Sequence, residues 1–216
     1  MGALVHIGEV GIHHAEGSLI LRPSLLAMSR LGTPTEIVAT LAVVFGEGLN
    51  CHPGMRKLAH KQQLRAALEV WQACAPEESD LDWITGWFSI RGGWNMGRSD
   101  PADIILIAQS LLKHGVLGDP EPRDENEPER DDEFSPGFDC RHHAALAMGH
   151  LSLSEAQAWD MTMTGLRVAL EAKYPKPAMT AAQQSAARAP TEAEYHETMA
   201  WHDKVLAANK AARGEA

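Results

Sequence analysis

Short apolar runs separated by glycines open the chain and predict extended structure. Residues 3–12 are rich in β-branched and apolar side chains, and Gly8 and Gly11 interrupt them. The stretch from His14 to Gly17 is typical of a turn, and the stretch from Ser18 to Leu21 of a second short strand. We therefore expect a β-hairpin. Because two strands alone are only marginally stable in water, this hairpin must pack against helices.

Apolar residues then recur every three or four positions, which is the spacing of one face of an α-helix. Thr33 is placed to cap a helix that begins at Pro34, and Glu36 stands where the partner residue of a capping box belongs. Gly46 is expected to end that helix. The same spacing, with start and stop residues at the ends, predicts further helices over residues 23–31, 53–75, 81–88 and 101–114.

Two more helices are expected near the C-terminal end of the ordered sequence. The first covers residues 138–150. The second runs from Leu153 to Tyr174, because Ser154 and Gln157 fit a capping box and Pro175 follows. One face of the second helix carries apolar residues at spacings of four, three and four, namely Trp159, Met163, Leu166 and Leu170.

Between these groups of helices, residues 119–133 change in character. Nine of the fifteen are Asp or Glu, three are Pro, and none is a large apolar residue. Such a stretch buries too little apolar surface to offset the entropy of ordering it, which predicts a flexible linker. The expected organisation is a hairpin-plus-helices domain, the acidic linker, a helix pair, and a partly disordered low-complexity tail with a terminal helix, over residues 1–118, 119–133, 134–176 and 177–216. The predicted fold class is mainly α with a small N-terminal β-hairpin, a minor α+β arrangement.

Composition and charge narrow the classes of function. The chain has 216 residues with 29 acidic and 19 basic side chains, a formal charge of −10, which argues against a nucleic-acid-binding surface. Three widely spaced cysteines imply no disulfide framework and are expected to be free thiols in a reducing cytosol. There is no signal-peptide pattern, and the longest aliphatic run, residues 104–108, is too short for a membrane span. We therefore expect a soluble cytoplasmic protein.

Motifs for catalysis or metal binding are weak. Histidines and cysteines cluster around residues 51–60 and 140–150, but neither cluster has the two close ligand pairs of a structural zinc site. The glycines at 92–97 lack the Lys-Ser or Lys-Thr of a phosphate loop, and no nucleophile elbow occurs. We expect no catalytic residue, no metal and no cofactor. A small metal-binding or enzymatic protein remains an alternative that rests only on the two clusters.

Tryptophan and methionine are abundant, at six and nine residues. Core filling is the preferred interpretation for most of them, although both residue types also favour interfaces. Two helices of a short segment can bury little surface alone, so some of their apolar residues must meet the first domain or another chain. The loop at 91–97 likewise places a tryptophan among glycines. The candidate partner-binding residues are Trp94, Trp159, Met161, Met163, Leu166 and Leu170.

Two segments resemble a known family. The run Leu21-Arg22-Pro23-Ser24, followed by residues 28–34 and 36–38, resembles the opening of proteins encoded in the tail-gene module of tailed phages. Residues 151–175, with Trp159-Asp160-Met161-Thr162-Met163-Thr164 in their core, resemble the C-terminal part of the same family. These proteins are similar to the tail assembly chaperones of phages with long, non-contractile tails, and many members are uncharacterised.

The resemblance implies a role in virion assembly in the host cytoplasm. Such chaperones bind the tape-measure protein, keep that long helical chain soluble, and recruit tail-tube protein before they are released. It also implies partner contacts on the second segment and leaves self-association open. Because of the charge and the short aliphatic runs, we expect neither nucleic acid nor a membrane among the partners. The alternative within the same gene module is a structural tail or head-tail joining protein that is retained in the virion.

Overall fold

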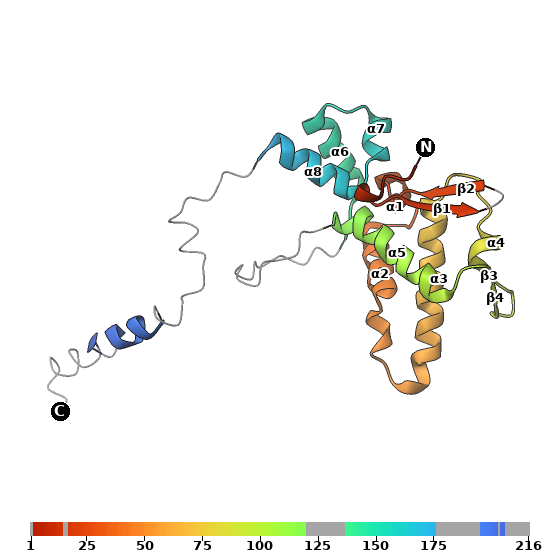
Figure 1. The fold of residues 1–216 in the computed structure, drawn as a ribbon, viewed down its shortest axis with the longest axis horizontal. Coiled ribbons are helices and arrows are strands. Elements are labelled where there is room, and N and C mark those ends of the chain that lie inside the picture. Colours follow the sequence, from red (N-terminus) through yellow and green to blue (C-terminus); the bar gives the residue numbers. More distant parts are fainter. Residues whose placement is uncertain (1, 15–16, 120–136, 176–194, 203, 206–216) are drawn as a thin grey trace. The chain divides into compact units, whose positions relative to one another are not determined.

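The computed structural model describes residues 2–14, 17–119, 137–175, 195–202 and 204–205 (Figure 1). Residues 1–120 and 133–176 form one compact unit. A second unit consists of residues 121–132 and 177–216, of which 195–202 and 204–205 are described and are helical. The fold is mainly α with a small N-terminal hairpin, which confirms the predicted fold class. Apart from Asp119, the predicted linker lies outside the described residues, as does most of the predicted tail.

The N-terminal hairpin forms as predicted, but it starts later. Strand β1 (Val10–His14) pairs antiparallel with β2 (Gly17–Leu21), and Val10 lies opposite Leu21. Residues Val5–Ile7, which were expected to be extended, form a 3-10 turn that ends at Gly8. The φ of Gly8 is +91°, and a Cβ there would lie 2.2 Å from the Cβ of His114. Glycine is therefore required where this turn meets the helical body.

Capping side chains set where the helices of the body begin. The Thr33 hydroxyl accepts a hydrogen bond from the Glu36 amide, and the Glu36 carboxylate accepts one from the Thr33 amide, which confirms the predicted capping box. Ser24 and Asp100 cap two other helices, each by accepting a hydrogen bond from a backbone amide of the first turn. The helices are α1 (Leu25–Ser29), α2 (Pro34–Phe45), α3 (Arg56–Cys74) and α5 (Pro101–Leu112), with 3-10 turns at Glu47–Leu49 and Pro53–Met55 and a π-helical turn at Lys113–Leu117.

The centre of the body lies where α3 packs against α5 and α2 (Figure 1). Trp71 of α3 is 1% exposed, and its indole Nε1 donates to the Ile104 carbonyl oxygen of α5 at 3.0 Å. The side-chain amides of Gln63 and Gln109 donate to the Val44 carbonyl oxygen at 2.9 and 3.0 Å. Because these bonds satisfy polar groups next to the core, they fix how α2, α3 and α5 lie against one another.

A second small hairpin follows α3 and differs from the prediction for residues 81–88. Only the start of that range is helical, and the rest pairs with the glycine-rich loop that follows it. The φ of Gly86 is +74°, and a Cβ there would lie 2.1 Å from the Asn95 carbonyl oxygen. This close approach of two backbones favours strand pairing over continuation of the helix. The elements are α4 (Asp82–Thr85), β3 (Gly86–Phe88) and β4 (Trp94–Met96).

The C-terminal segment contains α6 (Cys140–Leu151), α7 (Glu155–Asp160) and α8 (Met163–Lys173). The capping box of Ser154 and Gln157 is confirmed. The single helix predicted for residues 153–174 is wrong, because Met161 and Thr162 are extended and separate α7 from α8. The Leu25 amide donates to the Met161 carbonyl oxygen at 2.8 Å, and Thr162 forms a β-bridge with Ser24. Contacts with the start of α1 thus replace the helical hydrogen bonds at this position.

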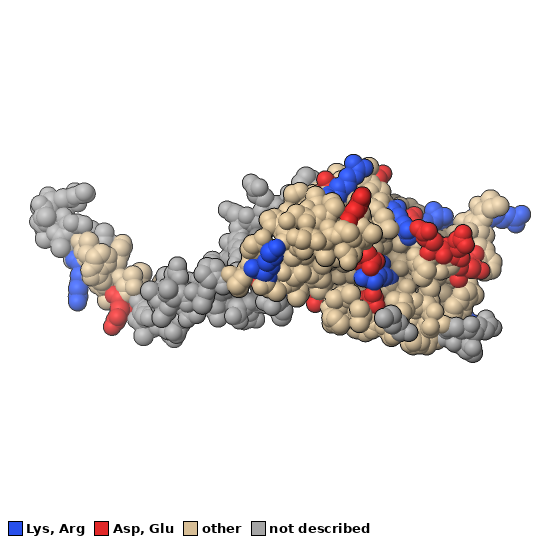
Figure 2. Space-filling view, turned by 90° about the horizontal axis from the view of Figure 1, so that it is seen from above, with Lys and Arg blue, Asp and Glu red and all other residues tan. Residues whose placement is uncertain are grey.

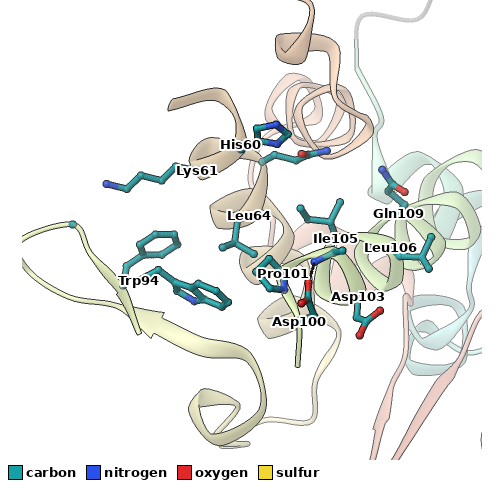
Figure 3. A pocket seen from close by; sticks show the side chains of 14 residues that line it. His60, Lys61, Leu64, Trp94, Asp100, Pro101, Asp103, Ile105, Leu106 and Gln109 are labelled. Carbon is teal, nitrogen blue, oxygen red and sulfur yellow. Dashed lines mark hydrogen bonds between the residues drawn. The ribbon is translucent and has the colours of Figure 1, made fainter. Parts of the chain in front are cut away.

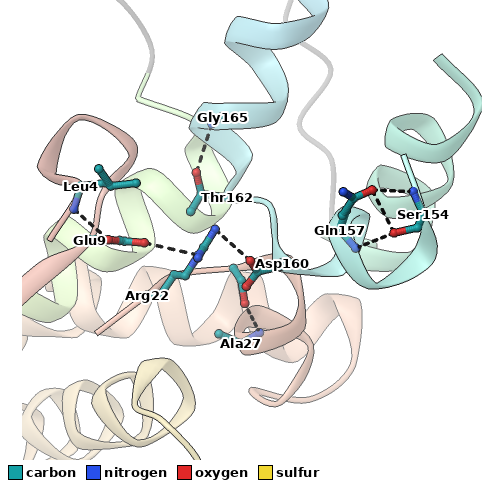
Figure 4. Close-up of polar contacts among 10 residues, drawn as sticks. Leu4, Glu9, Arg22, Ala27, Ser154, Gln157, Asp160, Thr162 and Gly165 are labelled. Carbon is teal, nitrogen blue, oxygen red and sulfur yellow. Dashed lines mark hydrogen bonds and ion pairs between the residues drawn. The ribbon is translucent and has the colours of Figure 1, made fainter. Parts of the chain in front are cut away.

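The C-terminal segment docks on the body, which answers a question that the sequence left open. Arg22 lies between Glu9 and Asp160, and its Nη2 is 3.0 Å from Asp160 Oδ2 (Figure 4). The Arg167 guanidinium donates to the Asp119 carbonyl oxygen at 2.7 Å. Buried residues from both segments share one core, including Met28, Leu111, Ala147, Ala158 and Leu166. Residues 137–175 are therefore part of the same compact unit as the hairpin and the first helices.

Candidate partner-binding groove

The structure disperses the six residues that the sequence proposed for partner binding. Leu166 has no exposed surface and belongs to the core, which corrects its assignment to a binding surface. Met161 and Met163 are partly buried where the C-terminal segment meets the body. A Cβ on Gly118 would lie 3.2 Å from Met163 Cγ, so this methionine packs closely on its own chain. These three residues therefore help to hold the fold together.

The two other candidates on the segment lie at separate hollows. Trp159 is partly buried and lines a hollow of about 660 Å³ together with residues of α1, α2 and the start of α6. Leu170 lines a smaller hollow of about 320 Å³ beside His150 and Tyr174. Neither hollow is shared with the methionines. The segment consequently does not present the continuous apolar face that a single uninterrupted helix would have carried.

Trp94 lines a cavity of larger volume than the hollows at Trp159 and Leu170. Helices α3 and α5 and the β3–β4 hairpin enclose a volume of about 780 Å³, which we call the α3–α5 groove (Figure 3). Its apolar floor comes from all three elements and consists of Leu64, Phe88, Trp94, Pro101, Ile105 and Leu106. Leu106 is 64% exposed although it is apolar. An exposed apolar surface inside a concave site is typical of a binding surface.

Lys61 lines the α3 side of the groove, and Arg65 lies one helical turn further along α3, next to the lining residue Phe88. Lys61 Nζ lies 5.8 Å from the centre of the Phe88 ring, and the Arg65 guanidinium carbon lies 4.7 Å from the same centre. Both cations thus stack on an aromatic ring of the hairpin, which holds the hairpin close to α3. Carboxylates mark the other side, where Asp100 and Asp103 stand at the start of α5. In Figure 3, Lys61 and Asp103 lie on opposite sides of Leu64, Pro101 and Ile105.

One polar atom of the groove region lacks a partner. The indole Nε1 of Trp94 is buried and has no hydrogen-bond acceptor among the described residues. A buried donor without an acceptor costs about 1–3 kcal/mol. The ring of Trp94 is therefore held in place by its apolar contacts rather than by a hydrogen bond.

On the face shown in Figure 2, Lys and Arg side chains are interspersed with Asp and Glu side chains, and no continuous basic patch is visible there.

The two buried thiols, Cys74 and Cys140, are poorly placed for chemistry. Burial raises the pKa of the Cys140 thiol to about 11 and raises the pKa of Cys74 further. Both thiols are therefore protonated at neutral pH, and a protonated thiol is a poor nucleophile and a poor metal ligand. Burial also lowers the pKa of His114, whose Nδ1 lies 3.0 Å from the Thr164 hydroxyl. Among the described residues, no three His, Cys, Asp or Glu side chains are grouped to hold a metal ion.

Sequence reasoning found only one residue of the groove floor. For the floor residues on α5, the signal was that the helix at 101–112 is apolar on most sides, which leaves Leu106 exposed after its inner face is buried. No helix among the described residues is long and apolar enough to cross a membrane. The groove can offer apolar contact area, an aromatic wall and two charged edges. These properties suit the binding of another polypeptide.

Comparison with known proteins places the chain in a family. The sequence model of a family of unknown function, DUF6246, matches residues 21–197. Searches among curated proteins and among solved structures found no match to the chain. The matched range begins at the last residue of β2 and includes every element that lines the α3–α5 groove, as well as α6, α7 and α8. This protein therefore belongs to DUF6246, a family of unknown function.

Proposed function

We propose that this protein is a non-enzymatic tail assembly chaperone of a tailed phage. It would bind the tape-measure protein and tail-tube subunits in the host cytoplasm, without a cofactor. The observation that carries the proposal is the α3–α5 groove, an open apolar site of about 780 Å³ with Leu106 exposed on its floor. The resemblance of residues 21–38 and 151–175 to tail assembly chaperones supports the same role.

The apolar lining of the groove suits a helical ligand. An α-helix with its side chains is about 10 Å across, and it docks by placing apolar residues at i, i+3, i+4 and i+7 into a groove. Further exposed apolar side chains occur on the β3–β4 hairpin outside the groove lining, where Trp87 is 49% exposed and Met96 is 64% exposed. A long helical chain such as a tape-measure protein would need such surfaces to stay soluble before the tail tube covers it.

The segments that carry the family resemblance meet in space. Ser24, in the first segment, forms a β-bridge with Thr162 in the second, and the Leu25 amide bonds to the Met161 carbonyl oxygen. Both segments thus build the junction between the body and the C-terminal helices. We infer that the resemblance reflects a shared fold, and that partner contacts are made at the groove rather than at this junction.

Co-expression with the tape-measure protein of the same gene module tests the proposal. We expect a soluble complex that co-purifies, and we expect Leu106→Glu to prevent its formation because a carboxylate would enter the apolar floor. Val168→Glu is the matched control, since Val168 of α8 is 53% exposed and lies outside the groove. Mass spectrometry of purified virions provides the second measurement. Finding this chain there in stoichiometric amounts would favour a structural tail or head-tail joining protein instead.

A further inference from the structure

The two long edges of the α3–α5 groove carry opposite charge. From this we infer that the groove holds an amphipathic helix with carboxylates along one side of its apolar stripe and cations along the other. The charged edges also set the direction in which that helix lies. This inference rests on the proposed function, because it assumes that the groove binds a helix, and it adds the chemistry of the helix and its orientation.

The α3 edge is positive for a structural reason. Lys61 and Arg65 are four residues apart on α3, so they lie on one side of the helix, and both stack on Phe88. A Cβ on Gly92 would lie 2.9 Å from Lys61 Nζ, which places the ammonium group at the turn of the hairpin. Among the described residues, neither Lys61 nor Arg65 forms an ion pair. The charge of Lys61, which lines the groove, therefore remains available to the carboxylates of a ligand.

The α5 edge is negative, and its two carboxylates have different roles. Asp100 Oδ1 accepts a hydrogen bond from the Ala102 amide at 2.9 Å, so this residue caps the helix. Asp103 lies in the first turn, is exposed, and forms no ion pair with a described residue. A carboxylate in a first turn also interacts favourably with the helix dipole. That contribution does not depend on a ligand, so the test must separate ligand binding from helix stability.

The geometry predicts one preferred direction for a ligand with charged sides. A helix that lies with its carboxylates toward Lys61 and its cations toward Asp103 makes favourable pairs along both edges. Turning the same helix end for end exchanges its two sides and opposes like charges along both edges. If the charges of the groove were exchanged, the reversed direction would become the favourable one. A variant that is merely destabilised would show no such reversal.

Binding of a designed peptide tests this directly. The probe is a helical peptide of about five turns with an apolar stripe, Glu along one side and Lys along the other, and a photo-cross-linker near its N-terminus. The full-length protein is compared with Lys61→Glu, Asp103→Lys and the double variant. We expect each single change to weaken binding by about threefold to tenfold, less at high salt, because exposed charge pairs contribute modestly. In the double variant the exchanged charges favour the reversed direction, whereas Asp100 is unchanged, so we expect part of the lost affinity to return and part of the cross-link to move to the opposite end of the groove.

The possible outcomes separate this inference from the proposed function. If Leu106→Glu abolishes peptide binding while the charge variants change neither affinity nor cross-link position, the inference is overturned and the groove remains a binding site. If the wild-type protein binds no helical peptide, the groove proposal itself fails. A peptide of residues 191–206 is the last probe, because Tyr195, Met199 and Trp201 are exposed on the chain's own terminal helix. Tighter binding of that peptide than of the designed one would assign the groove to this helix and overturn the inference.

Discussion

Replacing Leu166 by alanine tests whether the C-terminal helices and the body share one core. The Leu166 side chain has no exposed surface and lies in a cluster with residues of α1, α3 and α5. Truncating a fully buried leucine to alanine removes transfer energy and leaves a cavity, so we expect a loss of about 3 kcal/mol in unfolding free energy. For a unit of this size, that loss corresponds to a decrease in Tm of about 6–12 °C.

Urea unfolding followed by two probes measures this change. Far-UV circular dichroism reports all helices, whereas tryptophan fluorescence is dominated by residues of the body. Both probes should give one transition, shifted equally by Leu166→Ala. Val168→Ala, at a position that is 53% exposed on the same helix, should change stability by less than about 0.5 kcal/mol. A Leu166→Ala protein whose circular dichroism shows an early separate transition, with unchanged fluorescence, would refute a shared core.

Further predictions concern pH, thiol reactivity and the second hairpin. Burial lowers the pKa of His114, so below about pH 6.5 the unfolded chain binds more protons than the folded one. The free energy of unfolding should therefore decrease as the pH is lowered through this range. His114→Gln should make this pH dependence weaker, as measured by urea titrations at several pH values. In the native protein an alkylating reagent should label Cys51 quickly, whereas Cys74 and Cys140 should react only after denaturation, as intact mass would show. Gly97→Ala places a Cβ 2.4 Å from a backbone nitrogen, so amide hydrogen exchange should accelerate across β3–β4 and stay unchanged in α8.

Features that depend on neighbouring residues could be predicted from the sequence. The capping boxes at Thr33 and Ser154 are confirmed because each needs only the residue three positions later. The break between α7 and α8 could not be predicted. Met161 and Thr162 lie within a stretch whose apolar spacing fits one helix, but their backbone groups bond to Ser24 and Leu25, which are far away in the sequence. A local sequence pattern does not show that these long-range hydrogen bonds compete with those of a continuous helix.

The groove illustrates the same limit for function. Trp94 was identified because a tryptophan among glycines has no local reason to be there. The other floor residues look like ordinary helix and strand residues, and they become a site only through the angle at which α3 meets α5. Leu166 was assigned to a binding surface because its helical spacing matched that of its neighbours, and its burial depends on the packing of α8 against α6 and the turn Lys113–Leu117.

The docking of the C-terminal helices makes the compact unit discontinuous along the chain. The Asp119 carbonyl is held by Arg167, and the Phe138 amide donates to the Pro34 carbonyl oxygen at 3.0 Å, so residues on both sides of 120–136 are anchored to the same body. A chain cut within 120–136 would therefore become a two-fragment complex, held by the interface that now lies within one molecule. Its stability would then depend on protein concentration. The two halves could in principle be produced separately and would complement each other by reassociation.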